Sequence, residues 1–363
     1  MSQKPGNGFL SGDGLGGLDY LFRPGSIALI GITTDPGNPR QEWFLVPLFD
    51  AGFDGPIYLV NPRGGEIMGL PVYPDMRAIP GPVDYAIIST PADLCPQVLR
   101  DCGAKGVKVA IIYSAGFGET GSEGGNRLQD QLAEIAASGD IRLMGPNCMG
   151  VYCPEGKLSF ISDFPTESGP VSFLCQSGGN TIEAVMQSAQ RGVRFSKVVS
   201  YGDACDLNEC DFLEYYLNDP DTGIIALYIE GVREGKRFLE LLKKAAKVKP
   251  VIALKGGIGE AGSRTTASHT GSLSGSSAVW DALMRQYGIV QARSLEELSD
   301  LLVTFSLLPV PRSRTTVIVG MGGGASVLAA DHCETAGLSL PPPAIRYGRS
   351  FEGVHAGCRK HVE

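Results

Sequence analysis

The sequence predicts an α/β fold made of two consecutive parallel-sheet domains and the start of a third. Short apolar runs alternate with helix-like stretches, which is the pattern of βαβ units. Most of these runs end in glycine, serine, asparagine or proline, the residues that mark turns. The pattern restarts near residue 169 and again near residue 315, which indicates more than one sheet.

The first domain is predicted at residues 19–150, after a glycine-rich segment at residues 1–18 that we expect to be a flexible tail. Strands are expected at residues 26–30, 56–60, 83–88 and 107–113, with a helix near residues 41–50. The carboxyl ends of parallel strands face the ligand crevice of an open α/β sheet. We therefore interpret this region as a Rossmann-like, nucleotide-binding domain.

The second domain is predicted at residues 160–308 and a third, incomplete α/β domain at residues 314–363. For the second, we expect strands at residues 169–174, 195–200, 223–229 and 250–254, and helices at residues 211–217, 235–246 and 275–287. The third is predicted to begin with a strand at residues 315–319, a glycine turn and a helix at residues 325–336.

Composition narrows the class of protein. The formal net charge is −8, which disfavours nucleic-acid binding without excluding a local site for an anion. The nine cysteines form no CxxC pair, so we expect reduced thiols in a cytoplasmic protein rather than disulfides or a zinc site. No apolar run is long enough for a membrane span, and the first residues lack the apolar core of a signal peptide. The 49 glycines fall largely at strand-to-helix turns, which are candidate anion sites.

The turn after the first strand, residues 31–37, is not the GxGxxG of a dinucleotide site. Asn61 and Arg63 stand where such a site has an acidic residue, and an arginine there suits a phosphorylated nucleotide better than NAD. An ordinary turn with a solvated arginine is an equally good explanation from spacing alone.

Several collinear motifs carry a more specific resemblance. They include Gly-Pro-Asn-Cys-x-Gly at residues 145–150, Gln-Ser-Gly at residues 176–178 and Ser-His-Thr-Gly-Ser-Leu at residues 268–273. Between residues 21 and 340 the chain resembles the α-type portion of the NDP-forming acyl-CoA synthetases, the superfamily of ADP-forming acetyl-CoA synthetase and succinyl-CoA synthetase. The resemblance implies a CoA-binding Rossmann-like domain, then a flavodoxin-like ligase domain with a phosphohistidine loop, then the start of a third α/β domain.

The resemblance also implies which residues border coenzyme A in the first domain. These are Gly31, Thr33, Pro36, Asn61, Arg63, Ser89, Pro91 and Asn147. Backbone amides at strand ends together with one arginine suit the phosphates of this ligand.

His269 lies in a polar, glycine-rich loop that leads into a helix, where backbone amides can hold phosphoryl oxygens. From that context alone a surface-loop histidine is the more frequent explanation. The resemblance implies that His269 is phosphorylated and that Glu230, at the end of an apolar strand, orients it. A loop or helix-capping charge is the alternative for Glu230.

A second strand-to-helix turn is implied to contact the transferred phosphate, although an ordinary βα turn is the alternative. The phosphate-binding residues implied are Gln176, Ser177, Gly178, Gly179, Thr270 and Gly271. Cys175 departs from the serine common in the family, and we expect it to be a packing residue rather than a nucleophile. The acidic residues between 203 and 211 lack the spacing of a calcium loop, so we interpret them as loop and helix-start carboxylates, and no metal site is expected.

The implied reaction converts acyl-CoA, a nucleoside diphosphate and phosphate into a small carboxylic acid, CoA and the triphosphate, through an acyl phosphate and phospho-His269. ATP and ADP, or GTP and GDP, would bind with Mg²⁺ on an ATP-grasp β-type subunit or domain, for which no segment after residue 340 is a candidate. We therefore expect an α-type subunit or fragment that works in a hetero-oligomer. The alternatives are a CoA-binding regulatory or scaffold module without turnover and, disfavoured by the missing GxGxxG, a nicotinamide dehydrogenase.

Overall fold

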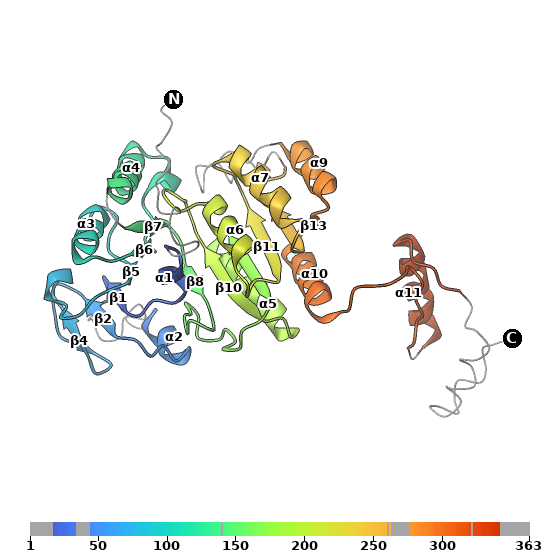
Figure 1. Ribbon diagram of the computed structural model, residues 1–363, viewed down its shortest axis with the longest axis horizontal. Coiled ribbons are helices and arrows are strands. Elements are labelled where there is room, and N and C mark those ends of the chain that lie inside the picture. The colour runs from blue at the N-terminus through green and yellow to red at the C-terminus, as the bar shows by residue number, and fades with distance from the viewer. Residues whose placement is uncertain are drawn as a thin grey trace. The chain divides into compact units, whose positions relative to one another are not determined.

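The computed structural model describes residues 17–33, 44–138, 141–259, 261–262, 276–320 and 322–341. The chain divides after Leu308 into two compact units, and each is described by itself. The first unit holds two sheets with their helices (Figure 1). No helix in the described ranges combines the length and the apolar character needed to cross a membrane.

The first sheet has seven strands in the order β3-β4-β2-β1-β5-β6-β7. They are β1 (Ile27–Ile30), β2 (Ile57–Val60), β3 (Glu66–Ile67), β4 (Leu70–Tyr73), β5 (Tyr85–Ile88), β6 (Val109–Ile112) and β7 (Arg142–Met144). All neighbours are parallel except the short pair β3 and β4. Successive strands add on opposite sides of β1, so the strand order reverses between β1 and β5, which is where the ligand crevice of a Rossmann-like sheet opens.

The first sheet forms where the sequence is continuously apolar. Every residue of β1, β5 and β6 is buried, as expected for central parallel strands covered on both faces. The helices of this part are α1 (Asp19–Phe22), α2 (Leu45–Asp50), α3 (Cys95–Lys105) and α4 (Glu123–Ser138). Helix α3 ends at Gly106, whose φ of +87° provides a left-handed C-terminal cap and returns the chain to β6.

The second sheet has six strands in the order β13-β12-β11-β9-β10-β8. They are β8 (Gly150–Tyr152), β9 (Val171–Cys175), β10 (Phe195–Ser200), β11 (Ile224–Ile229), β12 (Val251–Lys255) and β13 (Val290–Ala292). Only β8 is antiparallel to its neighbour. Without β8, the strand order is that of a flavodoxin-like sheet, with its reversal between β9 and β11.

Helices cover both faces of the second sheet. They are α5 (Gly178–Gln190), α6 (Glu209–Asn218), α7 (Gly235–Ala245), α9 (Ser277–Tyr287) and α10 (Leu295–Leu307). Helix α5 packs against α10, and α6 packs against α7 (Figure 1). From β9 to β10 the chain moves one way across the sheet, and from β10 to β11 it moves back the other way. Because both crossovers are right-handed, α5 and α6 lie on opposite faces.

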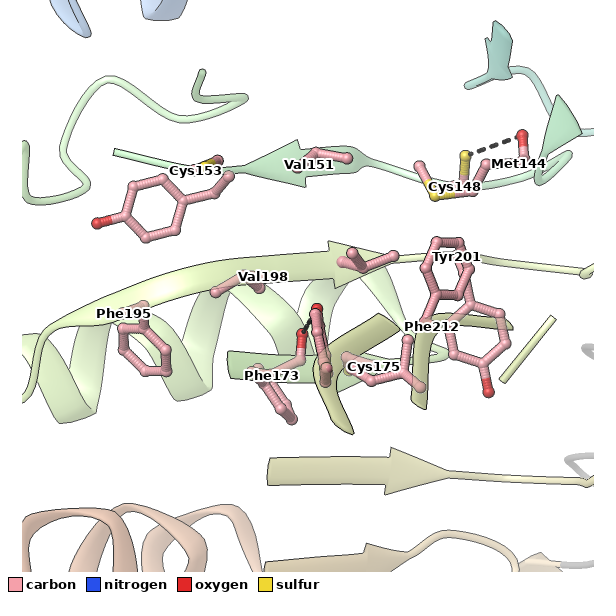
Figure 2. Close-up of a cluster of buried hydrophobic side chains, with 14 of the residues drawn as sticks. Met144, Cys148, Val151, Cys153, Phe173, Cys175, Phe195, Val198, Tyr201 and Phe212 are labelled. Atoms are coloured by element: carbon pink, nitrogen blue, oxygen red, sulfur yellow. Dashed lines mark hydrogen bonds between the residues drawn. The ribbon is translucent and has the colours of Figure 1, made fainter. Parts of the chain in front are cut away.

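The chain between β7 and β8 joins the two sheets. Residues 145–149 leave the edge of the first sheet, and β8 then pairs with β10 at the edge of the second. Figure 2 shows Val151 of β8 beside Val198 of β10, with Phe173 of β9 on the next strand. These side chains belong to one buried cluster that also includes Leu29 of β1, so both sheets share a core. A shared core fixes the two crevices relative to each other.

The structure confirms the predicted fold class and most of the predicted strands. The runs expected at residues 26–30, 56–60, 83–88 and 107–113, and their counterparts in the second sheet, are strands whose ends shift by at most two residues. Sequence reasoning missed β3, β4, β7, β8 and β13, which have two to four residues each. Four of them, β3, β7, β8 and β13, are edge strands of two or three residues, too short for an apolar pattern to stand out, and in β4 an exposed proline interrupts the pattern.

The second unit differs from the prediction at its first strand. Its helix α11 (Gly323–Thr335) overlaps the predicted helix, but the strand predicted at residues 315–319 is wrong. Within the described part of this unit, only an isolated bridge joins Thr315 to Ser339. Val317 and Val319 are 67% and 79% exposed, so their apolar side chains find no sheet to pack into. A strand needs such a neighbour to pair its backbone groups.

Candidate active site

A cavity of about 780 Å³ opens at the carboxyl ends of β1 and β5 and extends to the first turn of α5. The first sheet contributes the turns after β1, β5 and β6, and the second contributes the turn after β9 and Asp203 after β10. Asn147, Cys148 and Met149 of the connection between the sheets complete the wall. The cavity therefore joins the crevice of the first sheet to the turn that starts α5 in the second.

Five of the residues predicted to border CoA line this cavity. They are Gly31, Thr33, Ser89, Pro91 and Asn147. Gly31 has a φ of +89°, and a Cβ there would lie 2.9 Å from backbone atoms of Ser89 and Thr90. Only glycine lets the turns after β1 and β5 approach so closely. The Ser89 hydroxyl in turn donates a hydrogen bond to the Ile30 carbonyl at 3.1 Å.

Asn61 and Arg63 lie beside the cavity rather than in its described lining. The Asn61 side-chain amide donates to the Ile32 carbonyl at 2.7 Å, which fixes the turn after β1. The Arg63 backbone amide donates to the Asn61 side-chain oxygen at 2.9 Å, and the Arg63 side chain is exposed. Pro36 lies outside the described residues.

The turn after β9 forms the opposite wall, and Gln176, Ser177, Gly178 and Gly179 all line the cavity. Ser177 is the N-cap of α5, and its hydroxyl oxygen accepts from the Asn180 amide at 3.4 Å. A Cβ on Gly178 would lie 2.6 Å from the Met149 side chain, so this glycine brings the helix start against the connection between the sheets. The first amides of a helix have no partner within the helix, and they attract an anion.

Glu230 follows β11 and is 8% exposed. The side-chain oxygen of Gln176 accepts from the Glu230 amide at 2.9 Å and from the Gly231 amide at 3.1 Å. The Tyr228 hydroxyl donates to the Glu230 carboxylate at 3.1 Å. These contacts hold a carboxylate at the strand-order reversal of the second sheet, next to the turn that starts α5.

Lys255, at the end of β12, donates to the Glu230 backbone carbonyl at 2.8 Å. Burial lowers the pKa of Lys255 to about 8, against an opposing effect of the Glu230 charge. A cationic group and a carboxylate therefore lie together at this crevice. His269, Thr270 and Gly271 lie outside the described residues.

Comparison with known proteins agrees with this two-crevice geometry. A family model described as a CoA binding domain matches residues 25–154, and one described as a succinyl-CoA ligase like flavodoxin domain matches residues 168–305. The α subunit of ADP-forming acetate–CoA ligase II from Pyrococcus furiosus is 41% identical over 349 residues, which cover 95% of this chain and 76% of the relative. This chain belongs to the NDP-forming acyl-CoA synthetases, as an α-type portion.

Two further members of the superfamily are similar to this chain over most of its length. ADP-forming acetate–CoA ligase I from Archaeoglobus fulgidus is 39% identical over 324 residues, covering 89% of this synthetase chain but 46% of the relative. The dinucleotide forming acetyl-coenzyme A synthetase 1 of Candidatus Korarchaeum cryptofilum, solved with phosphate and ADP, has a TM-score of 0.80 at 35% identity. That match covers 90% of this chain and 70% of the solved one. The predicted order of a CoA-binding Rossmann-like domain and a flavodoxin-like ligase domain is therefore confirmed.

Cys175 of this synthetase chain packs behind the anion-binding turn. Its thiol is buried and donates to the Ser177 carbonyl at 3.1 Å. Burial raises the pKa of Cys175 to about 12, which keeps the thiol protonated and a poor nucleophile. The geometry agrees with the packing role expected from the sequence.

The acidic residues between 203 and 211 have separate roles in the synthetase fold. Asp206 pairs with Arg142 of β7 at 3.0 Å, and Asp211 pairs with Arg237 of α7 at 2.9 Å. Asp203 alone among them lines the cavity. Sequence reasoning grouped these residues and missed this difference, and it also missed Thr90, Tyr113 and Met149 as lining residues. The position of Asp203 three residues after the strand predicted at residues 195–200 was the signal available.

Proposed function

We propose that this chain is the α-type component of an acyl-CoA ligase. It interconverts acyl-CoA, nucleoside diphosphate and phosphate with a carboxylic acid, CoA and the nucleoside triphosphate. The observation that carries the proposal is the single cavity lined both by the turns at the strand-order reversal of the first sheet and by the turn from β9 into α5 of the second. One crevice has the features of a CoA site and the other those of a phosphate site, so a thioester and a phosphate can meet between them.

Coenzyme A binds in the first crevice. Gly31, Thr33, Ser89, Pro91 and Asn147 border it from the cavity wall. The lining fits such a ligand, because the glycine turn after β1 and the hydroxyl groups beside it offer donors to an anion. Asn61 and Arg63 support this crevice from outside, Asn61 by fixing the turn and Arg63 as a cation near the phosphates, and Pro36 belongs to the same turn.

Phosphate binds at the start of α5, on the amides of Ser177, Gly178 and Gly179, the Ser177 hydroxyl and the side-chain NH₂ of Gln176. Phosphate displaces CoA from the thioester and gives an acyl phosphate. His269 then takes the phosphoryl group, with Thr270 and Gly271 holding its oxygens through their amides. Glu230 accepts a hydrogen bond from one nitrogen of the His269 ring and so makes the other nitrogen the nucleophile.

A partner completes the reaction. An ATP-grasp β-type subunit or domain would hold ADP or GDP with Mg²⁺ and receive the phosphoryl group from His269, which makes the assembly a hetero-oligomer. The names of the relatives support acetate as the first acid to test. The cysteines in the described part are free, which suits the reducing cytoplasm.

The test is mass spectrometry for acid-labile phosphate on His269 after the chain is mixed with acetyl-CoA and inorganic phosphate. We expect His269→Ala to abolish the label. His332→Ala is the matched control, because His332 is exposed on α11 in the other unit, and it should label like the wild type. Equal labelling of the His269 variant would refute the mechanism. CoA binding without any label in the wild type would favour a regulatory module instead.

A further inference from the structure

Asp203 is the one carboxyl group among the described residues that line the cavity. Its side chain is 1% exposed. One carboxyl oxygen, Oδ1, accepts from the Asn147 side-chain amide at 3.4 Å. The other, Oδ2, is buried without a hydrogen-bond donor. A buried carboxylate oxygen without a donor is costly, so this arrangement calls for a functional explanation.

The backbone around Asp203 is held in an uncommon conformation. Gly202 has a φ of +61°, and Ala204 has a φ of +52°, which a residue with a side chain rarely adopts. The Asp203 amide donates to the Pro146 carbonyl at 3.0 Å. A Cβ on Gly202 would lie 2.3 Å from the carbonyl oxygens of Pro146 and Asn147. The loop after β10 is therefore fixed against the connection between the sheets, with Asp203 at the cavity.

The charges around Asp203 favour its protonated form. Burial and the neighbouring Glu119 carboxylate raise the pKa of Asp203 to about 8. Glu119 itself is held by the amides of Gly116 at 2.5 Å and Phe117 at 3.0 Å. Arg233, after β11, favours the charged form of Asp203 only weakly in comparison, and its guanidinium donates to the Asp203 backbone carbonyl.

The remaining titratable neighbours are the thiols of Cys148 and Cys205. Burial raises the pKa of both thiols, so they stay neutral. These surroundings therefore favour the protonated form of Asp203 at neutral pH. Protonation also lets the Asp203 carboxyl group share a hydrogen bond with the Glu119 carboxylate.

We propose that Asp203 exchanges this proton with the sulfur of coenzyme A during acyl transfer. The inference rests on the proposed function and adds a residue to it. As phosphate attacks the thioester carbonyl, the carbon–sulfur bond breaks and its electron pair goes to sulfur. The Asp203 carboxyl group gives its proton to that sulfur and becomes a carboxylate. In the reverse direction, the carboxylate takes the proton from the thiol as sulfur attacks the acyl phosphate and phosphate leaves.

Proton transfer from Asp203 helps the leaving sulfur of CoA more than the attacking phosphate. A phosphate anion attacks without a base, whereas a thiolate leaves more readily when it is protonated. A thiol with an ordinary pKa near ~8.5 is close to the value of Asp203, and matched values make proton transfer efficient. Asp203 also contacts Asn147, the residue proposed to border CoA, through the Asn147 side-chain amide.

The test isolates this step by giving the full chain acetyl phosphate and CoA and measuring acetyl-CoA formation from pH 6 to 9.5. Wild-type activity should rise with pH, with its midpoint near pH 8 and a plateau near pH 9, as the Asp203 carboxylate forms. Asp203→Asn should lower the rate by about 100-fold at pH 7, a typical loss for a proton-transfer group. The deficit should shrink above pH 9, where CoA ionises by itself. A uniform loss at every pH would mean a structural role and would overturn the proposal.

Glu119→Gln provides a second, independent variant. It removes the like charge beside Asp203 and should move the midpoint of the pH profile to lower pH. Asp130→Asn, an exposed carboxylate on α4, is the matched control and should leave the profile unchanged. An unmoved midpoint in Glu119→Gln would contradict the pairing of the two carboxyl groups.

Infrared spectroscopy gives a readout that does not depend on activity. The wild type at pH 7 should show a protonated carboxyl band that disappears at pH 9.5 and is missing in Asp203→Asn. Absence of this band in the wild type would overturn the inference but leave the proposed function intact. If the band is present but wild-type chain, with or without a β-type partner, makes no acetyl-CoA, the proposed function fails instead.

Discussion

The two crevices that meet at the cavity differ in what lines them. At the first, between β1 and β5, the described wall combines glycine, hydroxyl and apolar side chains such as Gly31, Ser89 and Phe44, and none of them is charged. At the second, between β9 and β11, a carboxylate and an ammonium group are buried together as Glu230 and Lys255. An uncharged wall suits a ligand whose charge stays constant, whereas buried ionisable groups suit a step in which charge moves. We therefore expect substitutions in the first crevice to weaken CoA binding and substitutions in the second to slow phosphoryl transfer.

Glu230→Gln tests the second crevice and should have the largest effect. If Glu230 fixes the tautomer of His269, the amide should lower phosphohistidine formation by about 100-fold or more. Acetyl-CoA affinity should stay the same, because Glu230 does not line the first crevice. Phosphate transfer is measured by labelling and CoA binding by calorimetry. Glu240→Gln, an exposed carboxylate on α7, is the control and should change neither. Equal losses in CoA binding and in labelling would contradict separate roles for the two crevices.

Gly31→Ala tests the first crevice. The left-handed φ costs an alanine about 1 kcal/mol, and the clash with the backbone at residues 89 and 90 adds to this, so we expect a loss of about 2–3 kcal/mol in unfolding free energy. CoA affinity should fall as well, because the turns after β1 and β5 must separate. Gly52→Ala is the control for backbone strain alone, since its φ is +76° but no atom lies near its Cβ. If Gly31→Ala loses no more stability than Gly52→Ala, the close approach of the turns after β1 and β5 is unimportant.

Asp203, which lines the cavity from the loop after β10, should make the stability of the protein depend on pH. Its folded-state pKa, about 8, lies above the ordinary value, so its contribution to stability is complete below about pH 4 and is lost as pH rises toward 8. Relative to Asp203→Asn, the wild type should lose about 1.4 kcal/mol of unfolding free energy per pH unit between pH 5 and 7. Chemical denaturation of both proteins at several pH values measures this slope. Parallel curves would mean that Asp203 is ionised in the folded protein.

The sequence was sufficient for the central strands and insufficient for the contacts between sheets. Runs such as residues 109–112 and 224–229 are apolar throughout because both faces of a central strand are buried, and that pattern is local. The same kind of pattern at residues 315–319 gave a wrong strand, because pairing depends on a neighbour that the run itself does not encode. Family motifs supplied Asn147 and Gln176, which the structure brings to one cavity.

Asp203 shows why part of the site could not be predicted. Its surroundings come from segments far apart in sequence, with Glu119 after β6 and Asn147 before β8. Burial by these segments changes an ordinary acidic residue into one that holds a proton at neutral pH. Neither composition nor spacing near residue 203 contains that information, because the charges that matter arrive through the fold.

Ser177 gives the smallest expected effect and the finest test of the anion site. As the N-cap of α5, it contributes about 1 kcal/mol to stability, and Ser177→Ala should lose that amount. Ser177→Gly should lose only a few tenths, because glycine is accepted at an N-cap. Both variants remove the hydroxyl from the cavity, so both should weaken phosphate binding to the same degree. Thermal unfolding and phosphate titration, measured side by side, separate the two roles. If phosphate affinity followed stability instead, the hydroxyl would act only by capping the helix, and the anion site would depend on the backbone amides alone.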